Sequence, residues 1–278
     1  MSTAPWPAAE PDLASILADY PNPIGALAAT EIPATVIRQA YDPAECAALI
    51  KRFVQWGLMR DPNDVNSADK RTRIDIGTSL GNRGHNQDGF LDHAVGTHEL
   101  FAHLFSGFTD PVKTMYDALS ALSPGKEVKT AREADGRLYG PAIFRIHYTT
   151  HSYIPHIDSV RLREKRTNYA VYRFQHQFAG ILCLQNALHG ERSAQTIVHN
   201  CLWNEETIQP HLANGTFHAF AKENQIEQYR VDLAPGDLYF FNTHCIHEIP
   251  PLDGNNPRIV LAVFIGYSPD DPEVYVWA

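Results

Sequence analysis

The stretch that decides the fold is "PGDLYFFNTHCIHEIPPLDGNNPRIVLAVF", residues 235–264. It contains a Pro-Gly-Asp turn, a strand, a histidine, a ten-residue gap and then Arg258, which opens an apolar strand. That last strand, expected over 258–268, is apolar enough to be buried on both faces. Further strands are expected before it, at 142–149, 169–186 and 228–242. Helical patterns followed by many short strands predict helices packed against a β-sandwich or barrel, a mainly β fold.

The first half of the chain carries the helical patterns. A strand at 32–41 runs into a helix that Asp42 caps, with Glu45 at the third helical position in a capping-box arrangement. A second helical zone spans about 97–123. Between the two helical zones lies a polar, glycine-rich stretch, 60–95. We expect it to be either a lid loop that closes on an anionic substrate or a solvated loop.

Composition limits the function classes. The chain has 278 residues, 44% of them hydrophobic, so we expect one domain over 1–278 with a disordered Pro/Ala-rich start at 1–12. A net charge of -9 without a basic tract argues against nucleic-acid binding. No segment resembles a signal peptide or has the apolar length of a membrane span, and scattered cysteines fit free thiols in the cytoplasm. The oligomeric state stays open.

A candidate metal site lies in "HYTTHSYIPHIDSV", residues 147–160. Side chains at i and i+2 of a strand point to the same face, so His156 and Asp158 can act together. Two histidines and one carboxylate form the face that binds Fe(II) and leaves three positions open. The His-x-Asp pattern alone also fits a surface polar pair. We interpret His147 and His151 as histidines of the strand face or loop, without a ligand role.

Arg258 favours the metal-site interpretation of the His-x-Asp pattern over the surface polar pair. It opens an apolar strand and is therefore expected inside the barrel, where a guanidinium is costly unless an anion pairs with it. A dicarboxylate co-substrate would supply that anion through a bidentate contact.

These motifs resemble those of the Fe(II)/2-oxoglutarate-dependent oxygenases: His-x-Asp, then "GDLYFFN" leading to a histidine, then His-x10-Arg. The resemblance covers about 32–278 and implies a double-stranded β-helix (jelly-roll, cupin-like) core. The words "PAIFRIHY", "NNPRIVLAVFIGYS" and "EVYVWA" are similar to a bacterial subgroup, the N-substituted amino-acid hydroxylases and indole-alkaloid halogenases.

Residue by residue, the resemblance implies that His156, Asp158 and His247 form the iron triad. It also implies that Arg258 grips the distal carboxylate of 2-oxoglutarate. His244 is a rival third ligand. We prefer His247 because it keeps the ten-residue gap to the arginine and is followed by Glu-Ile.

Other residues extend this assignment. Many relatives carry Ser or Thr two residues after the arginine, whereas this chain has Val260. Arg145 matches an arginine of the subgroup and either contacts the co-substrate or forms a structural ion pair. Tyr148, near it in the same expected strand, is assigned with it to cofactor binding. Arg83 and Arg161 are candidates for an anionic substrate group, against solvated charges.

The implied function is a cytoplasmic hydroxylase that uses Fe(II), 2-oxoglutarate and O2. Its ferryl species would abstract a hydrogen from a small molecule and hydroxyl rebound would follow. The subgroup suggests an amino acid, an N-substituted amino acid or a specialised metabolite. Halogenating relatives carry glycine where this chain has Asp158, so we predict hydroxylation over halogenation. Two alternatives remain: a non-catalytic jelly-roll protein that binds a metal or ligand, and a Zn(II) hydrolase on the same ligands.

Overall fold

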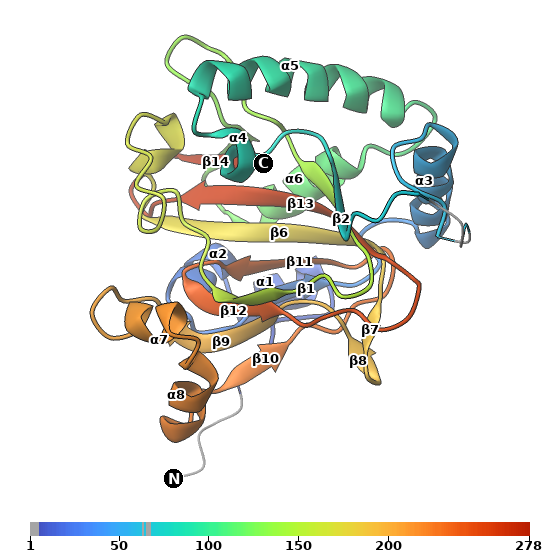
Figure 1. Ribbon diagram of the computed structural model, residues 1–278. Helices are drawn as coiled ribbons and strands as arrows, with labels where there is room; N and C mark the ends of the chain where they lie inside the picture. Colours follow the sequence, from blue (N-terminus) through green and yellow to red (C-terminus); the bar gives the residue numbers. More distant parts are fainter. Residues whose placement is uncertain (1–5, 63, 65–67) are drawn as a thin grey trace.

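Two β-sheets form the centre of the molecule in the computed structural model, which describes residues 6–62, 64 and 68–278. Side chains of both sheets, among them Val36 and Val260 of the larger and Val198 and Cys245 of the smaller, share one buried cluster. Helices cover the outer face of the larger sheet (Figure 1). The predicted mainly β fold with flanking helices and a jelly-roll core is confirmed.

The larger sheet has eight strands. Its main path is antiparallel except at its last pair, where β14 and β3 run parallel. Along the path it contains β1 (Thr35–Ile37), β11 (Leu238–Asn242), β6 (His176–Gln185), β13 (Arg258–Tyr267), β14 (Glu273–Trp277) and β3 (Glu127–Thr130), with β4 (Ile143–His147) on β13 and β2 (Arg73–Ile76) on β4.

The smaller sheet has four strands in the order β10 (Gln228–Arg230), β9 (Ile197–Leu202), β12 (Cys245–Ile249) and β5 (Tyr153–His156). The expected strand region 228–242 therefore does not form a hairpin. Its first strand, β10, pairs with β9, whereas β11 belongs to the larger sheet. The chain between them crosses from one sheet to the other. A short hairpin of β7 (Leu188–His189) and β8 (Arg192–Ser193) lies outside both sheets.

Strand β13 is buried on both faces and determines where Arg258 lies. All but one of its ten residues are buried, as its apolar sequence predicts. Ile259 and Leu261 pack into the core beneath the helices, whereas Val260 packs between the sheets. Because side chains alternate along a strand, Arg258 shares the face of Val260 and lies between the two sheets.

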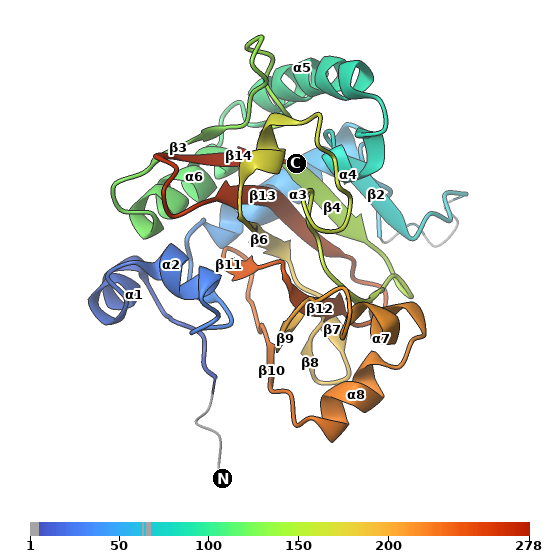
Figure 2. The same cartoon turned by 90° about the vertical axis from the view of Figure 1, so that its left-hand side faces the viewer.

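Five helices pack on the outer face of the larger sheet, as Figures 1 and 2 show. They are α1 (Leu13–Asp19), α2 (Pro23–Ala28), α3 (Pro43–Gln55), α5 (Gln87–Leu104) and α6 (Pro111–Leu122). Elsewhere lie the helices α4 (Leu80–Arg83), α7 (Gln209–Ala213) and α8 (Phe217–Glu223) and the 3-10 helix η1 (Ala170–Arg173). Among the described residues, no helix is both long and apolar enough for a membrane crossing.

Helix α3 begins as predicted, but its capping box does not form. The Asp42 carboxylate accepts from the backbone N–H of Ala44 at 2.8 Å. The Glu45 carboxylate accepts instead from the backbone N–H of Thr109 at 3.2 Å. Glu45 therefore ties α3 to the segment that leads into α6 and does not reach back to Asp42.

Three segment predictions need correction. Residues 1–5 of the expected disordered start lie outside the described residues, but 6–12 are ordered, with Ala9 bridging to Thr35 of β1. The stretch 60–95 is not one loop, because it contains β2, α4 and the start of α5. The helical zone 97–123 is two helices, α5 and α6, and α5 begins ten residues before the expected start. Lid movement of 60–95 stays a prediction.

Gly236 supplies a test of the crossover into β11. Its φ is +92°, and a Cβ there would lie 2.2 Å from the Tyr41 carbonyl oxygen. Gly236→Ala should therefore lower the free energy of unfolding by more than about 2 kcal/mol, through backbone strain and the clash. Gly254→Ala is the matched control, because its φ is +75° and no atom lies within 4 Å. Urea unfolding of both variants measures the difference, and equal losses would contradict this account of the turn.

Candidate active site

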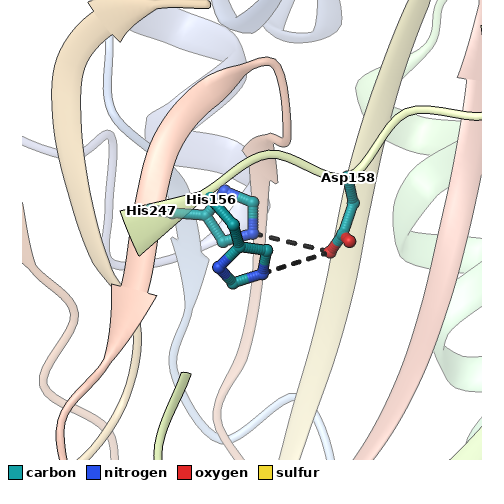
Figure 3. A group of neighbouring side chains, drawn as sticks. All are labelled: His156, Asp158 and His247. Atoms are coloured by element: carbon teal, nitrogen blue, oxygen red, sulfur yellow. Dashed lines mark ion pairs between the residues drawn. The ribbon is translucent and has the colours of Figure 1, made fainter. Parts of the chain in front are cut away.

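The candidate metal ligands come from two neighbouring strands and the bend that follows one of them. His156 ends β5 and His247 lies in the middle of β12, and the two are register partners in the smaller sheet. Asp158 lies two residues beyond the end of β5, so the predicted strand stops before it. Figure 3 shows the two imidazoles and the carboxylate turned toward one another.

The three side chains are close enough to share one ion. Their ligand atoms all lie within 4.8 Å of one another. Asp158 Oδ2 is 3.8 Å from His156 Nε2 and 3.5 Å from His247 Nε2. No other His, Cys, Asp or Glu trio in the described part of the chain has this geometry. The set matches the two-histidine, one-carboxylate face that suits Fe(II).

Backbone carbonyls orient both imidazoles. His156 Nδ1 lies 2.7 Å from the carbonyl oxygen of Ile154, and His247 Nδ1 lies 2.9 Å from that of Cys245. A carbonyl only accepts, so each Nδ1 must carry the proton and donate it. The lone pair of each Nε2 is then free toward Asp158. This tautomer is the one a metal site requires.

The charge states also fit a metal. Burial, with the neighbouring His247, lowers the pKa of His156 to about 4, so the imidazole is neutral at pH 7. Burial alone would raise the pKa of Asp158, but the neighbouring His247 and His156 imidazoles outweigh burial. The pKa of Asp158 therefore lies below its ordinary value. Thr243 fixes the Asp158 backbone, because its hydroxyl donates to the Asp158 carbonyl at 2.8 Å.

A cavity of about 730 Å³ lies between the sheets, and Arg258 lines it together with the three candidate ligands. Arg258 is 1% exposed. Its Nε donates to Gln195 Oε1 at 2.8 Å, and its Nη1 lies 3.3 Å from His147 Nδ1. Burial lowers the pKa of Arg258 from its ordinary value. Within the described ranges no carboxylate forms an ion pair with it, so this buried cation has only neutral partners.

Arg145 lines the same cavity, but Tyr148 does not. The pleat of β4 sends Arg145 and His147 toward the cavity, so Tyr148, one residue further, packs into the core on the opposite face. The Arg60 guanidinium lies 3.5 Å from the centre of the Tyr148 ring. Tyr148 thus lies outside the cavity lining, and these contacts lend no support to its assignment to cofactor binding.

The two candidate substrate arginines also lie outside the cavity. Arg83 is exposed at the end of α4, beside a second hollow of about 820 Å³. Arg161 is exposed, with its guanidinium 6.0 Å from the centre of the Tyr172 ring. The basic turn instead contributes Arg163, which donates to the Ile157 carbonyl at 2.9 Å and lies 3.5 Å from Asp158 Oδ1. The roles of Arg83 and Arg161 toward a substrate stay predictions.

Three other histidines lie near the site but outside the candidate ligand group. His244, the rival ligand, is buried beside Ser159, with Nε2 3.1 Å from the hydroxyl, and is not part of the ligand group. The His151 ring lies against that of His147, with ring centres 4.3 Å apart and the planes tilted by 33°. His147 lines the cavity and contacts Arg258, so it is more than a bystander, although it is no candidate ligand.

Some cavity residues carried no usable sequence signal. Gln195, the hydrogen-bond partner of Arg258, lies in the link between β8 and β9, outside any motif. Arg73 lines the cavity and pairs with Asp75 at 2.6 Å. The alternation Arg-Ile-Asp-Ile of β2 could have indicated a strand with one polar face, but it lay hidden within a polar, glycine-rich stretch.

Comparison with known families gives the identification. The family described as carrier-protein-independent halogenase WelO5 matches residues 12–278. The chain belongs to the WelO5 family. It is thereby a member of the Fe(II)/2-oxoglutarate-dependent oxygenases, whose cofactors are Fe(II), 2-oxoglutarate and O2, as the sequence predicts. The WelO5 family acts on small molecules without a carrier protein. Among the curated proteins, no sequence matches the chain.

Two solved structures of one enzyme show the same fold. An N-substituted L-amino acid dioxygenase from Burkholderia ambifaria AMMD is 18% identical, with a TM-score of 0.56 over 92% of this chain and 90% of that chain. Its complex with alpha-KG has a TM-score of 0.53 at the same identity and coverage. The alpha-ketoglutarate-dependent epimerase SnoN from nogalamycin biosynthesis is 12% identical, with a TM-score of 0.49 over 93% of this chain and 84% of that chain.

The ligand assignment can be tested by metal binding. His247→Ala should weaken Fe(II) or Co(II) binding by more than about 100-fold, because loss of a ligand costs more than loss of its outer partners. His244→Gln is the matched control and should bind metal like the parent, since His244 contacts Ser159 and no candidate ligand. Anaerobic equilibrium dialysis with metal analysis measures both variants. The reverse order of the two affinities would show that His244 is the third ligand.

Proposed function

We propose that this WelO5-family chain is an Fe(II)- and 2-oxoglutarate-dependent hydroxylase of a small molecule. The observation that carries the proposal is the position of the Asp158 carboxylate, which lies within 3.8 Å of both imidazole Nε2 atoms, in a cavity that Arg258 also lines. Asp158 supplies the third ligand that a hydroxylating iron site uses.

His156, Asp158 and His247 would hold Fe(II). Two neutral imidazoles and one carboxylate leave the metal with a net charge near +1 and with open positions for 2-oxoglutarate and O2. When bound, Fe(II) couples the oxidative decarboxylation of 2-oxoglutarate to succinate and CO2 with insertion of one O2 oxygen atom into a substrate C–H bond. The protein holds the reactants and excludes water.

Arg258 would bind the distal carboxylate of 2-oxoglutarate. A buried guanidinium without an anion is unfavourable, and a dicarboxylate that reaches from the metal to Arg258 supplies that anion. Arg145 adds positive charge to the same cavity, and its buried Nε has no partner there. Ala179, Ile181 and Phe241 form apolar walls, which keep water from the metal.

Asp158 favours hydroxylation over halogenation. In halogenating relatives a glycine at this position leaves room for chloride, whereas here the carboxylate occupies it. The motifs shared with the N-substituted amino-acid hydroxylases support an amino acid, an N-substituted amino acid or a specialised metabolite as the substrate. All four cysteines are free thiols that form no disulfide bond, which supports a cytoplasmic location.

Product analysis tests the reaction. With Fe(II), ascorbate, 2-oxoglutarate and a panel of amino acids and N-acyl amino acids, we expect succinate and a product heavier by one oxygen atom. Asp158→Gly should abolish hydroxylation because the carboxylate ligand is lost, whereas Asp270→Gly, at an exposed turn, should retain it. Unchanged hydroxylation in Asp158→Gly would contradict the assignment.

Other products would select an alternative. A chlorinated product from the parent in chloride buffer would make it a halogenase, and inversion without oxygen gain would make it an epimerase. Activity with Zn(II) and without O2 would favour the hydrolase. No turnover of 2-oxoglutarate across the panel would favour the non-catalytic binding protein.

Arg258 gives a separate prediction for the co-substrate. Arg258→Met should raise the KM for 2-oxoglutarate by about 100-fold or more, because a buried charge partner of the distal carboxylate is lost. The same variant should keep or raise the Tm of the protein without ligands, since it removes a buried unpaired cation. Arg230→Met on β10, outside the cavity lining, is the control. An unchanged KM in Arg258→Met would exclude this role.

A further inference from the structure

The carboxylate of Asp158 turns only one of its two oxygen atoms toward the other candidate ligands. Its Oδ2 lies 3.8 Å from His156 Nε2 and 3.5 Å from His247 Nε2. The two dashed lines in Figure 3 meet at this one oxygen. The second oxygen, Oδ1, lies 3.5 Å from Nη1 of Arg163, with which it forms an ion pair. The two oxygens of Asp158 therefore have different neighbours.

Hydrogen bonds hold the backbone of Asp158 but do not hold its carboxylate. The Asp158 N–H donates to the Thr243 carbonyl at 3.2 Å, and the Thr243 hydroxyl donates to the Asp158 carbonyl at 2.8 Å. The terminal torsion of an aspartate is broad and roughly twofold, so rotation about it can exchange the two oxygens. Contacts of the oxygens themselves must therefore fix the orientation of this carboxylate.

Arg163 is anchored on the same short segment of chain. Its backbone N–H donates to the Ser159 carbonyl at 3.2 Å, and its Nη1 donates to the Ile157 carbonyl at 2.9 Å. Ile157 is 2% exposed and belongs to a buried cluster with Ile246 of β12, so its carbonyl is a firm support. The same Nη1 thus contacts the main chain directly before Asp158 and the Oδ1 atom of Asp158 itself.

Arg163 has two opposing effects on a metal ion at the site. The contact with Oδ1 keeps Oδ2 toward the imidazoles, and outer partners of metal ligands change metal affinity by about 10–100-fold. The guanidinium charge repels the ion, but 53% of the Arg163 side chain is exposed, so water screens this repulsion. Because the Asp158 carboxylate lies between the guanidinium and the imidazoles, we expect its orientation to outweigh the repulsion.

We propose that Arg163 is a positioning residue for the metal site, whose guanidinium holds Oδ1 of Asp158 so that the carboxylate binds the ion through Oδ2 alone. This inference rests on the proposed function of the site. A carboxylate that bound through both oxygens would take one more coordination position. Binding through one oxygen preserves the three open positions of a two-histidine, one-carboxylate site. Arg163 acts through Asp158 and is not itself a ligand.

Metal binding in the absence of turnover tests this role. Anaerobic equilibrium dialysis with Co(II), followed by metal analysis, gives the affinity of each protein. Arg163→Met should weaken Co(II) binding by about tenfold. Arg192→Met is the matched control and should bind like the parent, because Arg192 is similarly exposed and pairs with Asp232 at 2.8 Å, outside the cavity lining. Both variants should keep the Tm of the metal-free parent, since an exposed ion pair contributes little to stability.

A double-mutant cycle separates positioning of Asp158 from a general structural role. In an Asp158→Ala background the carboxylate is absent, so the addition of Arg163→Met should cause no further loss of Co(II) affinity. A structural role of Arg163 would give the same loss in both backgrounds.

Three results would overturn the inference: an unchanged Co(II) affinity in Arg163→Met, an equal further loss in the Asp158→Ala background, or a marked fall in the Tm of metal-free Arg163→Met. A parent protein that binds neither Co(II) nor Fe(II) would instead overturn the proposed function itself.

Discussion

The constraint around which the site is built is one buried cation, the Arg258 guanidinium, which lies between the two sheets with only neutral partners. Burial of an unpaired charge opposes folding, and the protein tolerates it because the surrounding strands provide a large apolar core. Strand β13 sits near the middle of the larger sheet and is buried almost throughout. This rigid strand holds the guanidinium in place whether or not an anion is present.

The smaller sheet provides the opposite half of the site. The register of β5 and β12 places His156 beside His247. One backbone carbonyl fixes the tautomer of each ring. Asp158 completes the group from a bend that the Thr243 hydroxyl holds. The ligands thus rest on main-chain contacts of the sheet, which preorganises the site before a metal binds.

The pattern of helices and strands predicted the fold class, and the resemblance to a known family implied the three ligand candidates, whose ligand atoms the structure brings within 4.8 Å of one another. Predictions failed where tertiary contacts decide. The sequence could not show that Tyr148 faces away from the cavity, because the phase of the β4 pleat follows from its pairing with β13 and β2. In the turn after Asp158, spacing alone could not show that Arg163 and not Arg161 faces the carboxylate. Strand β2 was missed because its pairing with β4 is not visible in a polar segment.

The most direct test of the central claim is a crystal structure of the parent protein grown without O2 in the presence of Fe(II) and 2-oxoglutarate. We expect one iron bound to His156, Asp158 and His247, with the distal carboxylate of 2-oxoglutarate on Arg258. An iron bound elsewhere, or a 2-oxoglutarate molecule whose distal carboxylate lies away from Arg258, would contradict it.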